Sequence, residues 1–307
     1  MKYTFLFPGQ GSQTVGMGKD LYESFDVAKE KFDDANRILG RDLVSIIFNG
    51  PQEELTATQN TQPALFTIEA VISDILGQKG IAPSYTAGHS LGEYSALYAA
   101  GVLSFEDGLK AVARRGELMA RVGKATPGTM AAVIGMSREK IAEVLATVSS
   151  GIVVPANENS PEQTVISGEV PAVTEACEKL KAAGAKRAML LPVSGAFHSP
   201  LMQVAADEFA PFLDTITFSA PRCPVITNVT AKAETDPMLM KSLLVKQLIS
   251  PVHWVDAMNT LAQLDFGVCL ETGPGSVLKG LAKKCSDSLN VVPSDTATNI
   301  YSLLTNS

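Results

Sequence analysis

The sequence has few of the residues that crosslink small domains or bind metal. Its 307 residues include only four cysteines, and no two of them form a C-x-x-C pair. Such spacing argues against a zinc site and against the disulfide framework of a secreted protein, and it favours buried free thiols. A chain of this length buries a core large enough to need neither device. We therefore expect no metal site and a reducing compartment, the cytoplasm.

Long apolar runs and an excess of positive charge are also missing. No stretch approaches the roughly 20 apolar residues of a membrane-spanning helix. The N-terminal run MKYTFLF stops at Pro8, which is too short for a signal-peptide core and is typical of a first strand. The formal net charge of −7 argues against general nucleic-acid binding and leaves room for a local basic patch only. We expect neither nucleic acid nor membrane as a partner, and a monomer by default.

The chain has no internal repeat, and strand and helix patterns alternate along most of it. Strands are expected at 2–7 and 84–88, and helices around 18–39, 60–79, 91–101 and 105–122. This alternation predicts an α/β fold with a parallel sheet. The Gly-rich turn PGQGSQ (8–13) after the first strand lacks the lysine and spacing of a phosphate loop, so no nucleotide cofactor is expected.

The middle of the chain has a different order of elements. Its expected strands are 129–135, 152–157, 163–168 and 185–193, its helices are 137–148 and 171–184, and ENSPE (158–162) is the turn between two strands. The order β-α-β-β-α-β is the ferredoxin-like unit. We predict a small ferredoxin-like subdomain at 125–195, inserted into a core formed by 1–124 and 196–307.

The segment GHSLGEY (88–94) fits the G-x-S-x-G pattern of a nucleophile held on a sharp strand-to-helix turn. Glycines at 88 and 92 suit a backbone that is crowded between strand and helix. Ser90 would then stand at a helix N-terminus, where free N–H groups stabilise an oxyanion. The alternative is a Gly-rich structural turn.

A serine nucleophile needs a base, and the chain has only three histidines. His89 is adjacent to Ser90, so its side chain points elsewhere, and a packing or orienting role suits it. His253 precedes a helix and suits a structural role. His198 lies just before Ser199, the expected N-cap of a helix. The positive end of that helix dipole would lower the pKa of His198 and keep its ring neutral. His198 is therefore the candidate base. Spacing singles out no acidic third member, and a backbone carbonyl would serve to orient the ring.

Six segments together resemble a known family. They are FPGQGSQ (7–13), TQPALF (61–66), GHSLGEYSAL (88–97), RRGELM (114–119), GAFHS (195–199) and ETGPG (271–275). Their order and spacing resemble the signatures of the malonyl-CoA:acyl carrier protein transacylases, and the acyltransferase domains of polyketide and animal fatty-acid synthases are similar. The resemblance covers nearly the whole chain. It implies an α/β-hydrolase-like parallel-sheet core with an inserted ferredoxin-like subdomain, and no cofactor or metal.

The resemblance also implies roles for catalytic residues. Ser90 matches the acyl-accepting nucleophile, and His198 matches its base and acid. The backbone N–H groups of Gln10 and Leu91 would form the oxyanion hole. The backbone carbonyl of Gln247 would orient the His198 ring, in place of an acidic residue.

Substrate-binding roles follow from the same resemblance. Arg115 matches the arginine that binds the substrate carboxylate, which a guanidinium grips with two parallel hydrogen bonds. Arg114 is a competing candidate, and a helix salt bridge is the alternative role of Arg115. Phe197 matches an aromatic residue of malonyl-selecting members, and Gln62 would line the same pocket.

The resemblance implies a ping-pong reaction through a malonyl-serine intermediate. Malonyl-CoA would be the donor and the phosphopantetheine thiol of acyl carrier protein the acceptor, supplying fatty acid synthesis. The alternatives are a discrete polyketide acyltransferase, a serine thioesterase or esterase, and a non-catalytic carrier-binding module. An acidic carrier is expected to dock on a basic patch near the mouth of the site. Two clusters of basic residues are candidates, and the alternative for each is an ordinary solvated helix face. The candidate patches are Lys279, Lys283 and Lys284, and Lys181, Lys186 and Arg187.

Overall fold

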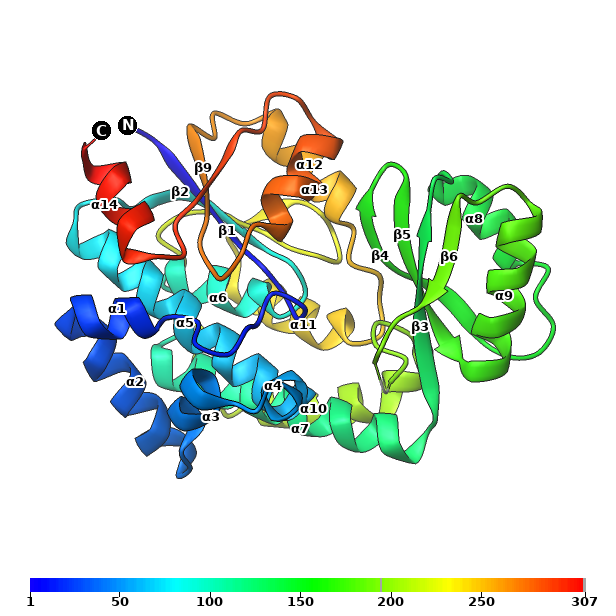
Figure 1. Cartoon of the computed structure of the whole chain (residues 1–307), viewed down its shortest axis with the longest axis horizontal. Helices are drawn as coiled ribbons and strands as arrows, with labels where there is room; N and C mark the ends of the chain where they lie inside the picture. Colours follow the sequence, from blue (N-terminus) through cyan, green and yellow to red (C-terminus); the bar gives the residue numbers. More distant parts are fainter. Residues whose placement is uncertain (194, 306–307) are drawn as a thin grey trace.

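Two sheets organise the part of the chain that the computed structural model describes, residues 1–193 and 195–305 (Figure 1). The larger sheet contains β1 (Tyr3–Phe7), β2 (Pro83–Gly88), β7 (Val225–Ile226), β8 (Ala233–Glu234), β9 (Val268–Glu271) and β10 (Val291–Pro293). Their spatial order is β10-β9-β1-β2-β7-β8, and all neighbours are parallel except β7 and β8. All five residues of β1 are buried, as expected of a parallel strand covered on both faces.

Helices surround this sheet. They are α1 (Lys19–Ser24), α2 (Asp26–Leu39), α3 (Leu43–Asn49), α4 (Gln52–Thr56), α5 (Thr58–Gln78), α6 (Gly92–Ala99), α7 (Phe105–Ala125), the 3₁₀ turn η1 (Pro200–Met202), α10 (Gln203–Leu213), α11 (Pro237–Gln247), α12 (Trp254–Ala262), α13 (Val277–Cys285) and α14 (Ala297–Thr305). The helical pattern expected around 18–39 is confirmed, but it is divided into α1 and α2 at Phe25. Phe25 is extended between α1 and α2, and its ring packs 5.5 Å from that of Tyr301. Within 1–193 and 195–305, no helix combines the length and apolar character needed to cross a membrane.

The smaller sheet has its own helices and core. Its elements are β3 (Gly128–Ile134), α8 (Arg138–Leu145), β4 (Val153–Ser160), β5 (Gln163–Glu169), α9 (Val170–Ala182) and β6 (Arg187–Leu190). The strands run antiparallel in the order β4-β5-β3-β6, and the predicted β-α-β-β-α-β order is confirmed. This sheet lies inside the segment 125–195, whose boundaries stay a prediction. With the parallel core, it confirms the predicted fold class.

Alternation along β3 gives the smaller sheet two different faces. Ala131 and Val133 pack in one cluster with Ile141 of α8 and Val173 of α9. Figure 1 shows both helices on the side turned away from the larger body. Met130 and Ala132 point to the opposite face and line a cavity described below. The smaller sheet therefore turns its second face toward the larger body, and Met130 and Val165 on this face pack in the same hydrophobic cluster as the core of that body.

The smaller sheet is joined to the larger body through the chain and through backbone pairing. The long helix α7 leads directly into β3 (Figure 1). At the end of β4, Glu158 N–H donates to Val252 O at 2.9 Å, and Val252 N–H donates to Ala156 O at 2.8 Å. The turn expected at 158–162 is wrong for its first three residues, because β4 continues to Ser160, where Glu158 and Ser160 still pair with residues 164 and 163 of β5.

Candidate active site

Ser90 stands on a tight elbow between β2 and α6. Its φ of 52° lies in the left-handed region, which is uncommon for a residue with a side chain. A Cβ on Gly88 would overlap the Gly92 carbonyl, and a Cβ on Gly92 would overlap the carbonyl of Phe7 in β1. The expected crowding of both glycines is confirmed. The elbow turns the Ser90 side chain away from the sheet edge into a cavity.

His198 is the histidine within reach of Ser90. Its Nε2 lies 2.8 Å from Ser90 Oγ, and its Nδ1 lies 2.8 Å from the backbone oxygen of Gln247. His89 instead pairs through Nε2 with Asn159 Oδ1 at 2.8 Å and packs against the Trp254 ring. Ser90, His198 and the Gln247 backbone oxygen therefore form the serine–histidine–carbonyl geometry of an activated nucleophile, and no carboxylate of residues 1–193 or 195–305 is the third member.

The pKa of His198 is lowered to about 3, first by burial and then by the positive charge of Arg115. The predicted direction is confirmed, but the predicted cause, a helix dipole, is not the one that the structure supports. The segment after Ser199 opens with only a three-residue 3₁₀ turn, while the His198 ring is enclosed by the protein. The ring is neutral at pH 7 and able to accept a proton from Ser90.

Arg115 is almost completely buried beside Ser90. Its Nη2 donates to Ser90 Oγ at 3.1 Å and to Gln247 Oε1 at 2.9 Å, and its Nη1 donates to Gln62 Oε1 at 2.8 Å. Its Nε is buried with no hydrogen-bond partner among the residues described. Its guanidinium also lies over the ring of Tyr94, 5.5 Å from the centroid.

The charge of Arg115 has no carboxylate in ion-pair contact within the described part of the chain. Buried charges are normally paired, so this cation is poised for an anion from outside the chain. Arg114, the competing candidate, forms ion pairs near the surface with Glu117 and Glu208. Arg115 rather than Arg114 therefore lies in the site, and it makes no helix salt bridge.

A cavity of about 280 Å³ encloses these groups between the larger body and the smaller sheet. Phe197 and the loop residues Gln10 and Leu91 line it from the larger body, while Met130 and Val165 line it from the smaller sheet. Gln62 was expected to line this cavity, but it does not. It is buried behind Arg115, where it accepts from Nη1 and donates to the sulfur of Met119 at 3.4 Å.

The amides of Gln10 and Leu91 are the two donors predicted for an oxyanion. Leu91 follows Ser90 at the start of α6, and Gln10 lies in the loop after β1. Neither amide donates a hydrogen bond to any other residue in 1–193 or 195–305. Both residues line the Ser90 cavity, so these N–H groups are available to a bound carbonyl oxygen.

Two polar residues of the site were missed in the sequence. Asn228, in the loop after β7, accepts from Ser90 N–H at 2.7 Å and donates to Gly88 O at 2.6 Å, so it ties the elbow together. Glu93 is buried in α6 and accepts from the Gln247 side chain. A charged residue inside the otherwise apolar helix 91–101 was a signal for Glu93, whereas nothing near Asn228 marked it.

A larger cavity of about 580 Å³ lies elsewhere, between β2 and the helices α5 and α6. Its carboxylate, Asp74, already has partners in the chain, since it pairs with Lys31 at 2.7 Å and accepts a hydrogen bond from Tyr98 at 2.6 Å. Burial raises the pKa of its lining thiol, Cys223, to about 11, which makes it unreactive at neutral pH. The smaller cavity is therefore the better candidate for chemistry.

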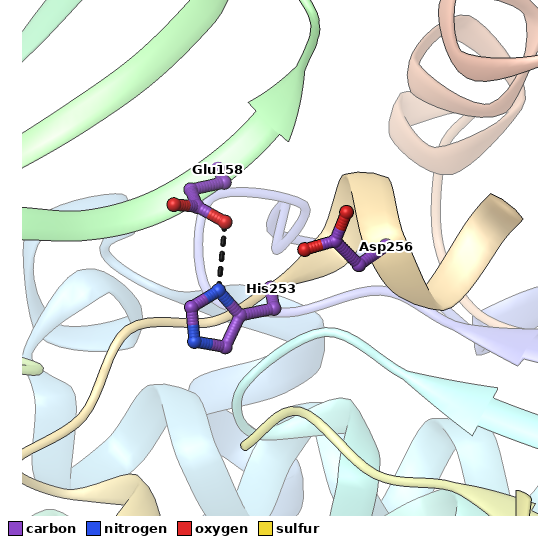
Figure 2. Close-up of side chains that lie close together, drawn as sticks. All are labelled: Glu158, His253 and Asp256. Carbon is purple, nitrogen blue, oxygen red and sulfur yellow. Dashed lines mark hydrogen bonds and ion pairs between the residues drawn. The ribbon is translucent and has the colours of Figure 1, made fainter. Parts of the chain in front are cut away.

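Apart from the two cavities, a cluster of polar side chains joins the smaller sheet to the larger body (Figure 2). Glu158 and His253 approach within 2.7 Å through Oε2 and Nδ1, and Asp256 lies within 4.8 Å of both. Arg138 of α8 already supplies a positive charge here, with Nη1 2.8 Å from Asp256 and 3.5 Å from Glu158. We treat these four residues as an ion-pair cluster, which agrees with the structural role expected of His253.

Comparison with known proteins gives matches over nearly the whole chain. The acyl transferase domain family model matches residues 4–301. The malonyl CoA-acyl carrier protein transacylase of Bacillus subtilis (strain 168) is 46% identical over 293 residues, 95% of this chain and 92% of that protein. The protein of the same name from Escherichia coli (strain K12) is 45% identical over 290 residues, 94% of each.

Solved structures agree with these sequence matches. An acyl carrier protein S-malonyltransferase from Vibrio cholerae has a TM-score of 0.95 and 43% identity, covering 99% of this chain and 100% of that one. A malonyl-transacylase solved in complex with a type II PKS acyl-carrier protein has a TM-score of 0.96 and 41% identity, with both chains fully covered. The similarity therefore extends over both sheets.

Proposed function

This chain belongs to the acyl transferase domain family, and on that premise we propose that it transfers a malonyl group from malonyl-CoA to an acyl carrier protein. One observation carries the choice of acyl group. Arg115 is buried without a carboxylate partner in the described residues, and its Nη2 lies 3.1 Å from the nucleophile candidate Ser90 Oγ. A site for neutral acyl groups has no need of such a cation.

The first half-reaction forms an ester on Ser90. Ser90 Oγ attacks the thioester carbonyl carbon while His198 Nε2 takes the hydroxyl proton. The negative oxygen of the tetrahedral intermediate is stabilised by the N–H groups of Leu91 and Gln10, each worth about 3–4 kcal/mol in comparable enzymes. The C–S bond then breaks, His198 returns its proton to the leaving thiolate, and malonyl-Ser90 and coenzyme A remain.

The second half-reaction repeats these steps with the carrier. The phosphopantetheine thiol gives its proton to His198, and its sulfur attacks the ester carbonyl. The C–O bond to Ser90 breaks, Oγ takes the proton back, and malonyl-carrier leaves. This chain's residues need no further group for either step, because the thioester donor and acceptor are similar in energy and the site only lowers the barrier between them.

Arg115 links recognition to chemistry in this mechanism. A malonyl carboxylate bound to the guanidinium balances the positive charge that lowers the pKa of His198. Substrate binding therefore makes His198 a stronger base, and an acyl group without a carboxylate does not have this effect. Phe197, which lines the cavity beside His198, supplies an apolar wall.

The carrier would dock beside α13. The exposed Lys279, Lys283 and Lys284 project from this helix, and Cys285 at its end lies 3.8 Å from the carbonyl of Asn159, a cavity-lining residue. The other predicted patch lies on the smaller sheet, where Lys186 pairs with Glu162 at 3.5 Å. The relative solved with a polyketide carrier supports carrier binding at this fold. Supply of fatty acid synthesis is the pathway that we propose.

Intact-mass measurement tests the reaction directly. The protein is mixed with malonyl-CoA, acetyl-CoA or methylmalonyl-CoA, and Ser90→Ala is treated in parallel. We expect one malonyl group on the native chain, little acetyl or methylmalonyl, and none on Ser90→Ala. Malonylation of Ser90→Ala at the native rate would contradict the assignment of the nucleophile. Carriers from fatty acid and polyketide synthesis, offered in competition, decide between the two pathways.

The lifetime of the acyl-enzyme separates a transferase from a thioesterase or esterase. A transferase keeps water from malonyl-Ser90 until a thiol arrives, so we expect an ester that persists for minutes and disappears on addition of holo-carrier. Rapid hydrolysis without carrier would favour the hydrolase instead.

A further inference from the structure

Glu93 is a buried carboxylate and the one charged residue of α6. It is 1% exposed, and it lies three residues after Ser90 in the first turn of α6. Its Oε2 accepts from Gln247 Nε2 at 2.6 Å and from Asn228 N–H at 3.2 Å. Burying a carboxylate costs several kcal/mol unless its partners compensate. The transfer mechanism above makes no use of Glu93, so its presence needs a separate explanation.

Gln247 connects Glu93 to both sides of the active site. Its backbone oxygen holds His198 Nδ1 at 2.8 Å, and its side-chain Oε1 accepts from Arg115 Nη2 at 2.9 Å. One residue therefore contacts the candidate base and the candidate substrate-binding cation.

The orientation of the Gln247 amide depends on acceptors around its nitrogen. Besides Glu93 Oε2, the Nε2 group faces Ser90 O at 3.0 Å and Asn228 Oδ1 at 3.3 Å. A flipped amide would place its oxygen against these acceptors and its NH₂ group against the guanidinium of Arg115. The contact with Glu93 is the shortest of the three, so Glu93 is the strongest determinant of this orientation.

We propose that Glu93 is a positioning residue for acyl transfer: through the Gln247 side chain it holds Arg115 against Ser90, and it anchors the residue whose backbone oxygen holds His198. The part that concerns Arg115 and a malonyl carboxylate rests on the proposed function. The role requires an oxygen acceptor at the right reach and does not require a negative charge. In support, burial raises the pKa of Glu93 to about 7, so its neutral form, which still accepts through one oxygen, is populated near neutral pH.

Two conservative variants separate reach from charge. Glu93→Asp keeps the charge but withdraws the oxygens by one methylene, and Glu93→Gln keeps the reach and the acceptor but removes the charge. We expect Glu93→Asp to slow malonyl-Ser90 formation about tenfold, the loss of roughly one hydrogen bond, and Glu93→Gln to slow it less than about threefold. The reverse order, or equal losses, overturns the proposal. If Glu93→Asp does not fold, a loss greater than tenfold in Glu93→Gln overturns it alone.

Two further measurements exclude a merely structural role. We expect Glu93→Asp to lower the ratio of malonyl-CoA to acetyl-CoA acylation rates, because a general loss of packing would lower both rates equally. In a Gln247→Ala background, which keeps the backbone carbonyl but has no amide to orient, Glu93→Asp should cause little additional loss. Additive losses, or an unaltered acyl ratio, contradict action through Gln247.

A substrate-independent probe distinguishes failure of this proposal from failure of the proposed function. An alkyl fluorophosphonate phosphonylates an activated serine and releases fluoride without needing a carboxylate site. We expect its rate of Ser90 labelling to be lower in Glu93→Asp than in Glu93→Gln. Labelling in this order on a chain that takes no malonyl would refute the proposed function and keep the positioning role. If the native chain is malonylated and the fluorophosphonate labels the native chain, Glu93→Asp and Glu93→Gln at equal rates, the positioning role alone is refuted.

Discussion

At residue scale, Arg115 combines burial, charge and position. It lies within hydrogen-bond distance of Ser90 Oγ, and its charge helps to lower the pKa of His198. A neighbouring arginine shows how much depends on one position along a helix. Arg114 is about 100° around α7 and reaches only surface carboxylates. Of two adjacent arginines, Arg115 therefore lies in the candidate active site, and Arg114 forms ion pairs at the surface.

Replacement of Arg115 by Ala should change acyl selectivity. We expect the malonylation rate to fall about 10- to 100-fold, since a charge-assisted pair with the substrate carboxylate is lost. Acetylation should rise relative to malonylation, because the cation that lowers the pKa of His198 is gone. Stopped-time intact-mass analysis with both donors measures this. Arg114→Ala is the matched control, and an unaltered malonyl preference in Arg115→Ala would remove that residue from its role.

Titration of Glu93 should make stability depend on pH. Its pKa is raised from 4.5 to about 7 in the folded chain by burial, which corresponds to about 3 kcal/mol. A raised pKa means that stability is full below pH 4.5 and is lost as pH rises toward 7. Glu93→Gln cannot titrate, so its free energy of unfolding relative to the native chain should increase by about 3 kcal/mol between pH 4.5 and 8. Urea unfolding at several pH values measures this difference in free energy. If the unfolding free energies of the native chain and Glu93→Gln change in parallel with pH, the prediction is wrong.

At element scale, the elbow between β2 and α6 depends on backbone packing. Gly92 lies against the carbonyls of Phe7 and Pro8, and Gly88 lies against the first turn of α6. The helix can therefore start directly over the end of β1, which brings Gln10 and Leu91 to the same cavity. The ion-pair cluster of Figure 2 acts at the same scale, because it joins α8 and β4 to α12.

Substitution of Gly92 should separate crowding from helix propensity. Gly92→Ala places a methyl group against backbone that has no side-chain freedom, so we expect a loss of about 3 kcal/mol or more in unfolding free energy. Gly280→Ala in α13 is the control, since a Cβ there meets nothing within 4 Å. It should gain up to about 1 kcal/mol from helix propensity. Thermal and urea unfolding of both variants provide the comparison, and similar effects from the two would argue against a crowded elbow.

At the scale of the whole molecule, the reaction chamber lies between the larger body and the smaller sheet, whose outer face has a core of its own. The larger body supplies Ser90, His198 and Arg115, while β3 and β5 of the smaller sheet cover them. The extension of β4 to Val252 and the helix α7 fix this cover in place (Figure 1). Under the proposed function, we expect a tethered thiol to enter along the line where the two bodies meet, next to α13.

Charge reversal on α13 should impair the carrier step. In Lys283→Glu/Lys284→Glu we expect the KM for an acidic carrier to rise about tenfold, with a smaller change in kcat, because steering and docking weaken. The defect should shrink as salt is raised from 50 to about 300 mM, since exposed charges are screened. Lys181→Glu/Lys186→Glu on the smaller sheet is the matched control. A larger KM effect in that control would move the docking surface to the smaller sheet.

Local patterns in the sequence were sufficient for part of this result. The strand-elbow-helix at 88–94 and the β-α-β-β-α-β order at 125–195 were predictable, because glycine spacing and hydrophobic periodicity reflect interactions between near neighbours in sequence. The choice of His198 over His89 followed from side-chain direction on an elbow. The extended Phe25 and the extra length of β4 were not predictable from their own residues, because Phe25 packs against Tyr301 and the end of β4 pairs with β5 and with Val252.

By itself, the sequence determined the fold class, the candidate nucleophile and base, and the resemblance that its six motifs carry. Only the tertiary structure decided which groups support them. Glu93, Asn228 and Gln247 are separated by more than 100 residues or lie on different elements, yet one amide of Gln247 contacts the other two within 3.3 Å. The cause of the lowered pKa of His198 was likewise hidden, because burial and the field of Arg115 exist only after the chain has folded.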